Sequence, residues 1–116
     1  MATYTKQKLS GSTDGKPISI TATSTPGTVI HTAVAGTSNF DEIWLWAQNN
    51  GTTDVLLTVE FGSADAVNNI IVSVPYKSGM FPIIPGLILQ NGATVKAFAG
   101  TTAVVSILGF VNNIAN

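Results

Sequence analysis

The sequence lacks cysteine and arginine and carries little charge of either sign. Without cysteine the chain forms no disulfide and no thiolate metal site, which excludes the disulfide-stapled secreted scaffolds. Charged residues make up 9% of the chain, against about 25% in an average soluble domain. The five lysines are scattered and the net charge is -1, so the clustered cations that neutralise nucleic-acid phosphates are missing. We therefore expect no nucleic-acid partner.

Long hydrophobic runs are also missing. Residues 1–10 are polar, and the most apolar stretch, residues 80–89, is interrupted by Pro82, Pro85 and Gly86. It is far shorter than the about 20 residues of a membrane helix, and the N-terminus has no signal-peptide core. We expect no membrane partner and synthesis in the cytoplasm without a cleavable export signal.

Hydrophobic residues make up 45% of the chain in spite of the low charge. A lone monomer normally stays dispersed through its surface charge. Here Thr, Ser, Asn and Gly carry the polar surface instead, which is typical of proteins packed against copies of themselves or a partner. The composition predicts a homo-oligomer.

The pattern of the chain predicts one all-β domain. A length of 116 residues suits a single core, and turn residues recur roughly every 8–12 positions, as in a sandwich or barrel. In the run 55–61, Val55, Leu57 and Val59 fall on one face, an alternation of period two. We predict an antiparallel two-sheet β-sandwich over residues 17–116. Residues 1–16, which are polar and end in a turn cluster, are predicted to form an N-terminal arm.

Two of the predicted strands, residues 42–48 and 102–111, are apolar on both faces. In residues 42–48, Ile43 and Leu45 point one way, and Trp44 and Trp46 point the other. Since only one face of a sheet covers the core, the second face needs a further cover, and a neighbouring subunit is the simplest one. Trp44 and Trp46 are therefore predicted to lie in the core or a subunit interface. Paired indoles could instead form a platform for a sugar ring, and the pattern leaves both readings open.

Residues 76–86 join two predicted strands and are rich in proline. This segment carries Met80, Phe81, Ile83 and Ile84, which would form an apolar patch if the segment runs over the surface. It either folds over an open end of the sandwich or docks on a partner. With the two tryptophans, these four residues are the predicted interface.

The candidates for chemistry are few. His31 could serve as a base or a metal ligand, but the sequence has no second histidine and no cysteine, so we expect a surface histidine on the outer face of its strand. Asp41 and Glu42 are adjacent and should point to opposite faces. Asp65 lacks the oxygen spacing of a calcium loop and suits a polar hairpin loop. We predict no catalytic, cofactor-binding or metal site, and no enzyme activity.

The order of features resembles that of small virion proteins of tailed bacteriophages, in particular head decoration (cement) proteins. The likeness spans roughly residues 27–114 and rests on the segments GTVIHT (27–32), DEIWLWAQN (41–49), GLIL (86–89), GATVKA (92–97) and ILGFV (107–111). It is a likeness of pattern, and none of these segments is a diagnostic motif.

This resemblance implies a β-sandwich, often jelly-roll-like, that forms a trimer on the outer capsid surface of the virion. Such a trimer clamps neighbouring subunits of the major capsid protein, and the family has no catalytic residues to transfer. The expected function is therefore a non-catalytic capsid decoration protein. The alternatives are a carbohydrate- or receptor-binding β-sandwich, for which the tryptophan pair speaks, and another virion part such as a tail or head fibre.

Overall fold

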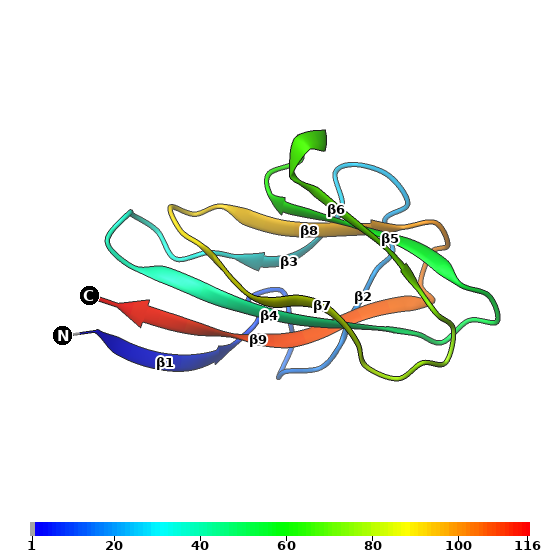
Figure 1. The fold of residues 1–116 in the computed structure, drawn as a ribbon, viewed down its shortest axis with the longest axis horizontal. Coiled ribbons are helices and arrows are strands. Elements are labelled where there is room, and N and C mark those ends of the chain that lie inside the picture. Colours follow the sequence, from blue (N-terminus) through cyan, green and yellow to red (C-terminus); the bar gives the residue numbers. More distant parts are fainter. Residues whose placement is uncertain (1) are drawn as a thin grey trace.

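The computed structural model describes residues 2–116 and confirms the all-β prediction (Figure 1). The described chain contains nine strands and one 3-10 turn: β1 (Thr3–Lys8), β2 (Ile18–Ser19), β3 (Thr28–Thr32), β4 (Phe40–Asn49), β5 (Val55–Gly62), η1 (Ala66–Asn68), β6 (Asn69–Val74), β7 (Phe81–Leu89), β8 (Thr94–Ala99) and β9 (Val105–Ala115). Val55, Leu57 and Val59 are buried on one face of β5, as their alternation predicts.

The strands form two antiparallel sheets that pack face to face. The first sheet has the order β1-β9-β4-β7, with the short β2 also paired to β9, and the second has the order β3-β8-β5-β6. Apart from β2, the strands pair in order from the two ends of the chain toward its middle: β1 with β9, β3 with β8, β4 with β7 and β5 with β6. This nesting of hairpin pairs over two layers is the strand order of a jelly roll.

The core lies between the two sheets and is built by alternate residues of each strand. On β4 the buried members are Ile43, Leu45 and Ala47, and the residues between them are partly exposed. The structure thus shows which face of β4 covers the core, a choice that the sequence left open. Trp44 and Trp46 lie on the outer face of the first sheet, away from the core.

Residues 1–16, expected to be an arm, are largely part of the sandwich. Thr3–Lys8 pair along β9, Leu9 is fully buried in the core, and the Gly11 N–H donates to the Ile30 carbonyl at 2.9 Å. The polar composition is that of an edge strand whose side chains are all exposed. Because β9 would otherwise present unpaired backbone groups, a polar strand at this position satisfies them.

Residues 81–89 form a strand in spite of their prolines, which the sequence led us to place in a loop. β7 is the edge of its sheet, where one side of the backbone has no ladder partner and proline is tolerated. Two register shifts against β4 leave Ile83 and Gly86 as extra residues in β7. The prediction for Ile84 is wrong: it pairs opposite Leu45 and is 2% exposed, so it belongs to the core.

A buried carboxylate fixes the connection between β2 and β3. Glu60 on β5 is fully enclosed and accepts hydrogen bonds from the Thr25 hydroxyl at 2.5 Å and from the Gly27 N–H at 2.7 Å. A buried charge needs such donors. The loop therefore lies against the outer face of the second sheet.

The assignment of the core face can be checked by a matched pair of substitutions. Ile43→Ala should lower the free energy of unfolding by about 2–5 kcal/mol, because it leaves a cavity between the sheets. Leu56→Ala, at a side chain that is 57% exposed, should change it by less than about 0.5 kcal/mol. Urea denaturation followed by circular dichroism measures both, and equal losses would contradict the assignment.

Deletion of residues 2–10 should destabilise the domain strongly. The deletion removes β1 from the edge of β9 and Leu9 from the core, and the loss of one buried leucine alone costs about 2–5 kcal/mol. The point variant Leu9→Ala separates the two contributions. A truncated protein with the melting temperature of the full chain would show that the segment is a dispensable arm after all.

Candidate functional site

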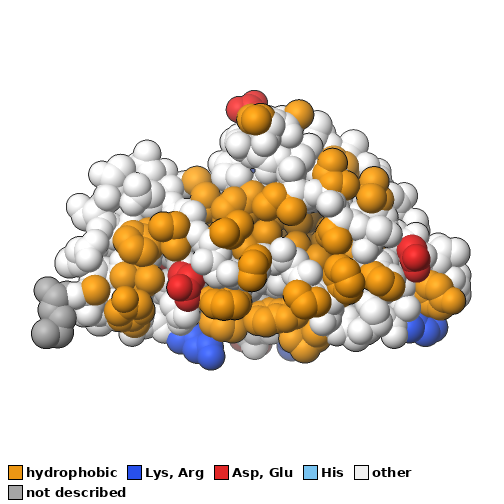
Figure 2. All heavy atoms as spheres, in the orientation of Figure 1, with side chains coloured by type: hydrophobic (Ala, Val, Ile, Leu, Met, Phe, Trp, Pro, Cys, Tyr) orange, Lys and Arg blue, Asp and Glu red, His pale blue; other side chains and the backbone are white. Residues whose placement is uncertain are grey.

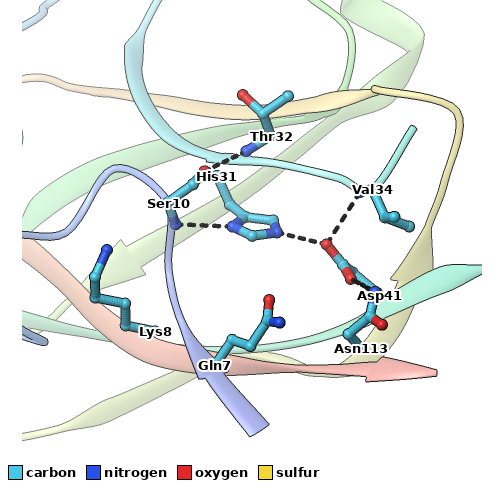
Figure 3. Close-up of a pocket in the computed structure, with 8 residues that line it drawn as sticks. All are labelled: Gln7, Lys8, Ser10, His31, Thr32, Val34, Asp41 and Asn113. Atoms are coloured by element: carbon cyan, nitrogen blue, oxygen red, sulfur yellow. Dashed lines mark hydrogen bonds and ion pairs between the residues drawn. The ribbon is translucent and has the colours of Figure 1, made fainter. Parts of the chain in front are cut away.

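An open hollow lies on the side of the sandwich where the end of β1 approaches β3 and β4 (Figure 3). The residues lining it are Gln7, Lys8, Ser10, His31, Thr32, Val34, Asp41 and Asn113. Its polar floor is the pair His31–Asp41, in which Nε2 and Oδ2 are 2.7 Å apart and both side chains are buried.

The hydrogen bonds of His31 define its tautomer. The Ser10 N–H donates to Nδ1 at 2.9 Å, so Nδ1 carries no proton and Nε2–H donates to Asp41. Asp41 also accepts from the Val34 N–H at 3.2 Å and the Asn113 amide at 2.9 Å. Both ring nitrogens are therefore occupied, and no lone pair is free to take a proton from a substrate. Through these bonds the pair joins β3, β4, β9 and the segment that follows β1.

The expectation that His31 lies on the outer face of its strand is wrong. The pairing of β3 with β8 shifts register between Val29 and His31. Such a bulge inserts an extra residue and re-aims the next side chain. Ile30 and His31 consequently both point inward and are buried, which strict alternation cannot predict.

The carboxylates take separate positions. Asp41 is buried and Glu42 lies on the outer face, as their adjacency predicts. Asp65 is exposed in the loop before β6 and hydrogen-bonds with Ser63. Residues 2–116 contain no cluster of three metal-ligating side chains. Within the same residues no helix has the length and apolar character to cross a bilayer.

Three aromatic rings gather on the outer face of the first sheet. The ring centroids of Trp44 and Trp46 are 6.5 Å apart, and Phe110 from β9 lies 6.2 Å from Trp44 and 6.1 Å from Trp46. The planes of Trp46 and Phe110 are inclined by 18° and 16° to that of Trp44. We call Trp44, Trp46 and Phe110 the aromatic platform.

The contact with Gly86 shows how the Trp44 ring lies on the sheet. A Cβ atom at Gly86 would meet three consecutive ring atoms of Trp44, Cζ2, Cε2 and Cη2, at 2.8, 3.0 and 3.3 Å. Similar distances to three neighbouring atoms mean that the ring face, and not its edge, rests on the glycine. The rings of Trp46 and Phe110 are nearly parallel to the Trp44 ring.

Polar groups border the platform. The Trp44 indole N–H donates to Glu42 Oε1 at 2.8 Å, and the Asn112 amide donates to the same oxygen at 3.0 Å. The bond from Asn112, and after it the bond from Trp44, lowers the pKa of Glu42. Burial acts in the opposite direction and raises this pKa, but its effect is smaller. On the β1 side the Lys6 ammonium lies 4.3 Å over the Phe110 ring, a cation–π contact.

The structure separates the six residues predicted as an interface. Trp44 and Trp46 belong to the platform, Met80 is exposed before β7, and Phe81 and Ile83 are partly buried on β7, while Ile84 is in the core. Phe110, Lys6 and Asn112 were not predicted from the sequence. They come from other strands, and only the register of the sheet brings them beside Glu42 and Trp44.

The chain matches no protein-family model, no curated protein and no solved structure.

Glu42 should contribute an acid-sensitive part of the stability. Its pKa is lowered in the folded protein from the ordinary 4.5, so its contribution is complete above that value and is lost as the pH falls through the folded pKa. Glu42→Gln should therefore lose less stability than the wild type on acidification below about 4.5. Melting temperatures of both proteins across this range measure the difference. Parallel curves would contradict the role of the carboxylate.

Proposed function

We propose that this chain is a non-catalytic structural protein of a viral particle, a head decoration (cement) protein. In this proposal copies of the chain form a homo-oligomer, a trimer, on the outer capsid surface of the virion and clamp neighbouring subunits of the major capsid protein. The observation that carries it is an uncovered apolar side on a jelly-roll fold.

That side lies between the edge strands β6 and β7, and we call it the β6–β7 side. Its members are apolar residues of the two strands that flank the opening between the sheets: Ile70, Val72, Phe81, Leu87 and Leu89. Leu87 is 43% exposed, and Met80, just before β7, is also exposed. Ile71 and Ile88, which alternate with these residues, are exposed on the outer faces of their strands. Figure 2 shows the hydrophobic side chains gathered over and around β7.

Contiguous apolar surface of this kind marks an interaction site. Burial of such surface is worth about 25 cal/mol per Å², which favours its contact with a second copy or a partner. The sparse charge of the chain keeps the desolvation cost of that contact low. Pro82 and Pro85 lack the N–H that an added strand would need along β7, so the expected contact is made by side chains and not by sheet extension.

The fold is compatible with this role. Jelly rolls occur among viral capsid proteins and also among lectins, and fold alone does not decide between functions. An oligomeric clamp gains from multivalency: after one protomer has docked on the shell, the others bind at high effective concentration, and avidity rises by about 100-fold or more without new contacts.

The oligomer is tested by a charge placed on the β6–β7 side. We expect the wild-type protein to have the mass of a trimer by size-exclusion chromatography with light scattering. Leu87→Lys should shift it to the monomer, because a buried unpaired ammonium opposes association. Thr13→Lys, on the exposed turn that follows β1, adds the same charge elsewhere and should leave the mass unchanged.

The clamp itself is tested by co-sedimentation with undecorated shells of the major capsid protein. The wild type should bind these shells and raise their melting temperature, and Leu87→Lys should bind at least tenfold more weakly. A wild-type protein that stays monomeric at high concentration and does not bind shells would overturn the proposal.

A further inference from the structure

We propose that the aromatic platform is a binding site for a neutral oligosaccharide, with pyranose rings stacked on Trp44 and Trp46 and hydroxyl groups hydrogen-bonded to Glu42 and Gln48. The proposal goes beyond the decoration function and does not depend on it. The site uses the outer face of β4, whereas oligomerisation is assigned to the β6–β7 side.

The form of the two indoles is the first support. The rings of the two indoles are nearly parallel, with an angle of 18° between their planes and a distance of 6.5 Å between their centroids. Trp44 rests on Gly86 with one face, and both indoles remain partly exposed. Flat, partly exposed aromatic rings match the flat, apolar C–H faces of pyranose rings.

The polar residues of the same strand are the second support. The outer face of β4 reads Glu42, Trp44, Trp46, Gln48 in order, so hydrogen-bonding groups lie at both ends of the indole pair. Gln48 is oriented by a bond of 3.0 Å from its amide to the Ser106 hydroxyl, which leaves its carbonyl oxygen as an acceptor. The spacing suits an extended ligand with an apolar face and hydroxyl groups along its rim.

The charge of Glu42 selects the class of sugar. Its Oε1 receives both the Trp44 and Asn112 donors, and among residues 2–116 its Oε2 has no hydrogen-bond partner. An ionised oxygen accepts bonds from sugar hydroxyls and makes them stronger than neutral ones. A carboxylate or sulfate on the ligand would be repelled by the same group. The site therefore favours neutral sugars over uronates, sialosides and sulfated glycans.

A protein partner on this face is less well matched. Interface cores are depleted in charged residues, yet Glu42 and Lys6 border the platform directly, and the Lys6 ammonium covers part of Phe110. A partner side chain would have to desolvate both charges. A hydroxyl-rich ligand keeps them hydrogen-bonded.

The test begins with an array of neutral and acidic oligosaccharides probed with the full-length protein. Titration calorimetry then measures the affinity for the neutral oligosaccharide that gives the strongest signal. Trp44→Ala and Trp46→Ala should each weaken binding by about tenfold or more, the equivalent of about 1.4 kcal/mol. Tyr76→Ala removes an exposed aromatic ring outside the platform and should bind like the wild type.

Further variants keep the test independent of folding and of assembly. If Trp44→Ala fails to fold, Trp44→Phe keeps a smaller flat ring and should bind with intermediate affinity. Leu87→Lys should retain full saccharide binding even as a monomer, so failure of the assembly proposal does not affect this one. Binding of no neutral sugar, preference for acidic sugars, or equal affinity in both tryptophan variants would overturn the inference. So would a loss of oligomer mass in Trp44→Ala, which would make the platform a protein interface.

Discussion

The pairing of β4 with β9 is the constraint on which the rest of the structure depends. Ten consecutive residue pairs join the two strands, from Phe40 opposite Ile114 to Asn49 opposite Val105. Because side chains alternate across a strand, a slip of one residue would exchange the core face with the outer face. The register therefore decides that Ile43 and Leu45 are buried and that the tryptophans are not. Gly109 secures it, since a Cβ atom there would lie 2.0 Å from the Trp44 carbonyl oxygen.

The same register assembles two polar clusters on opposite sides of the sheet. On the inner side Asn113 donates to Asp41, which binds His31 and through it the segment that follows β1. On the outer side Asn112 reaches Glu42 beside Trp44. Two neighbouring asparagines thus donate hydrogen bonds to two neighbouring carboxylates, of which one is buried and the other partly exposed. The buried cluster has its hydrogen bonds satisfied and stabilises the fold, whereas the outer one keeps an acceptor for a ligand.

Alternation and turn spacing in the sequence predicted the fold class and which residues share a face of β4 and β5. They did not predict where the strict period breaks. The bulge in β3 turns His31 inward. The two bulges in β7 turn Ile84 into the core of the sandwich. The prolines of this segment had led us to expect a loop there. Leu9 was missed because it stands alone in a polar segment. The platform needed long-range pairing, since Phe110 and Trp44 are neighbours only through the register of β9 with β4.

The irregularity of β7 connects the two proposed surfaces. Pro85 and the extra residue Gly86 remove a donor from the sheet edge and leave a site without a side chain beside β4. The first effect discourages the edge-to-edge pairing to which an exposed strand is prone. The second lets the Trp44 indole lie flat, because any larger residue at position 86 would lift it off the sheet. One short break in the ladder thus protects the edge of the sandwich and shapes the platform beside it.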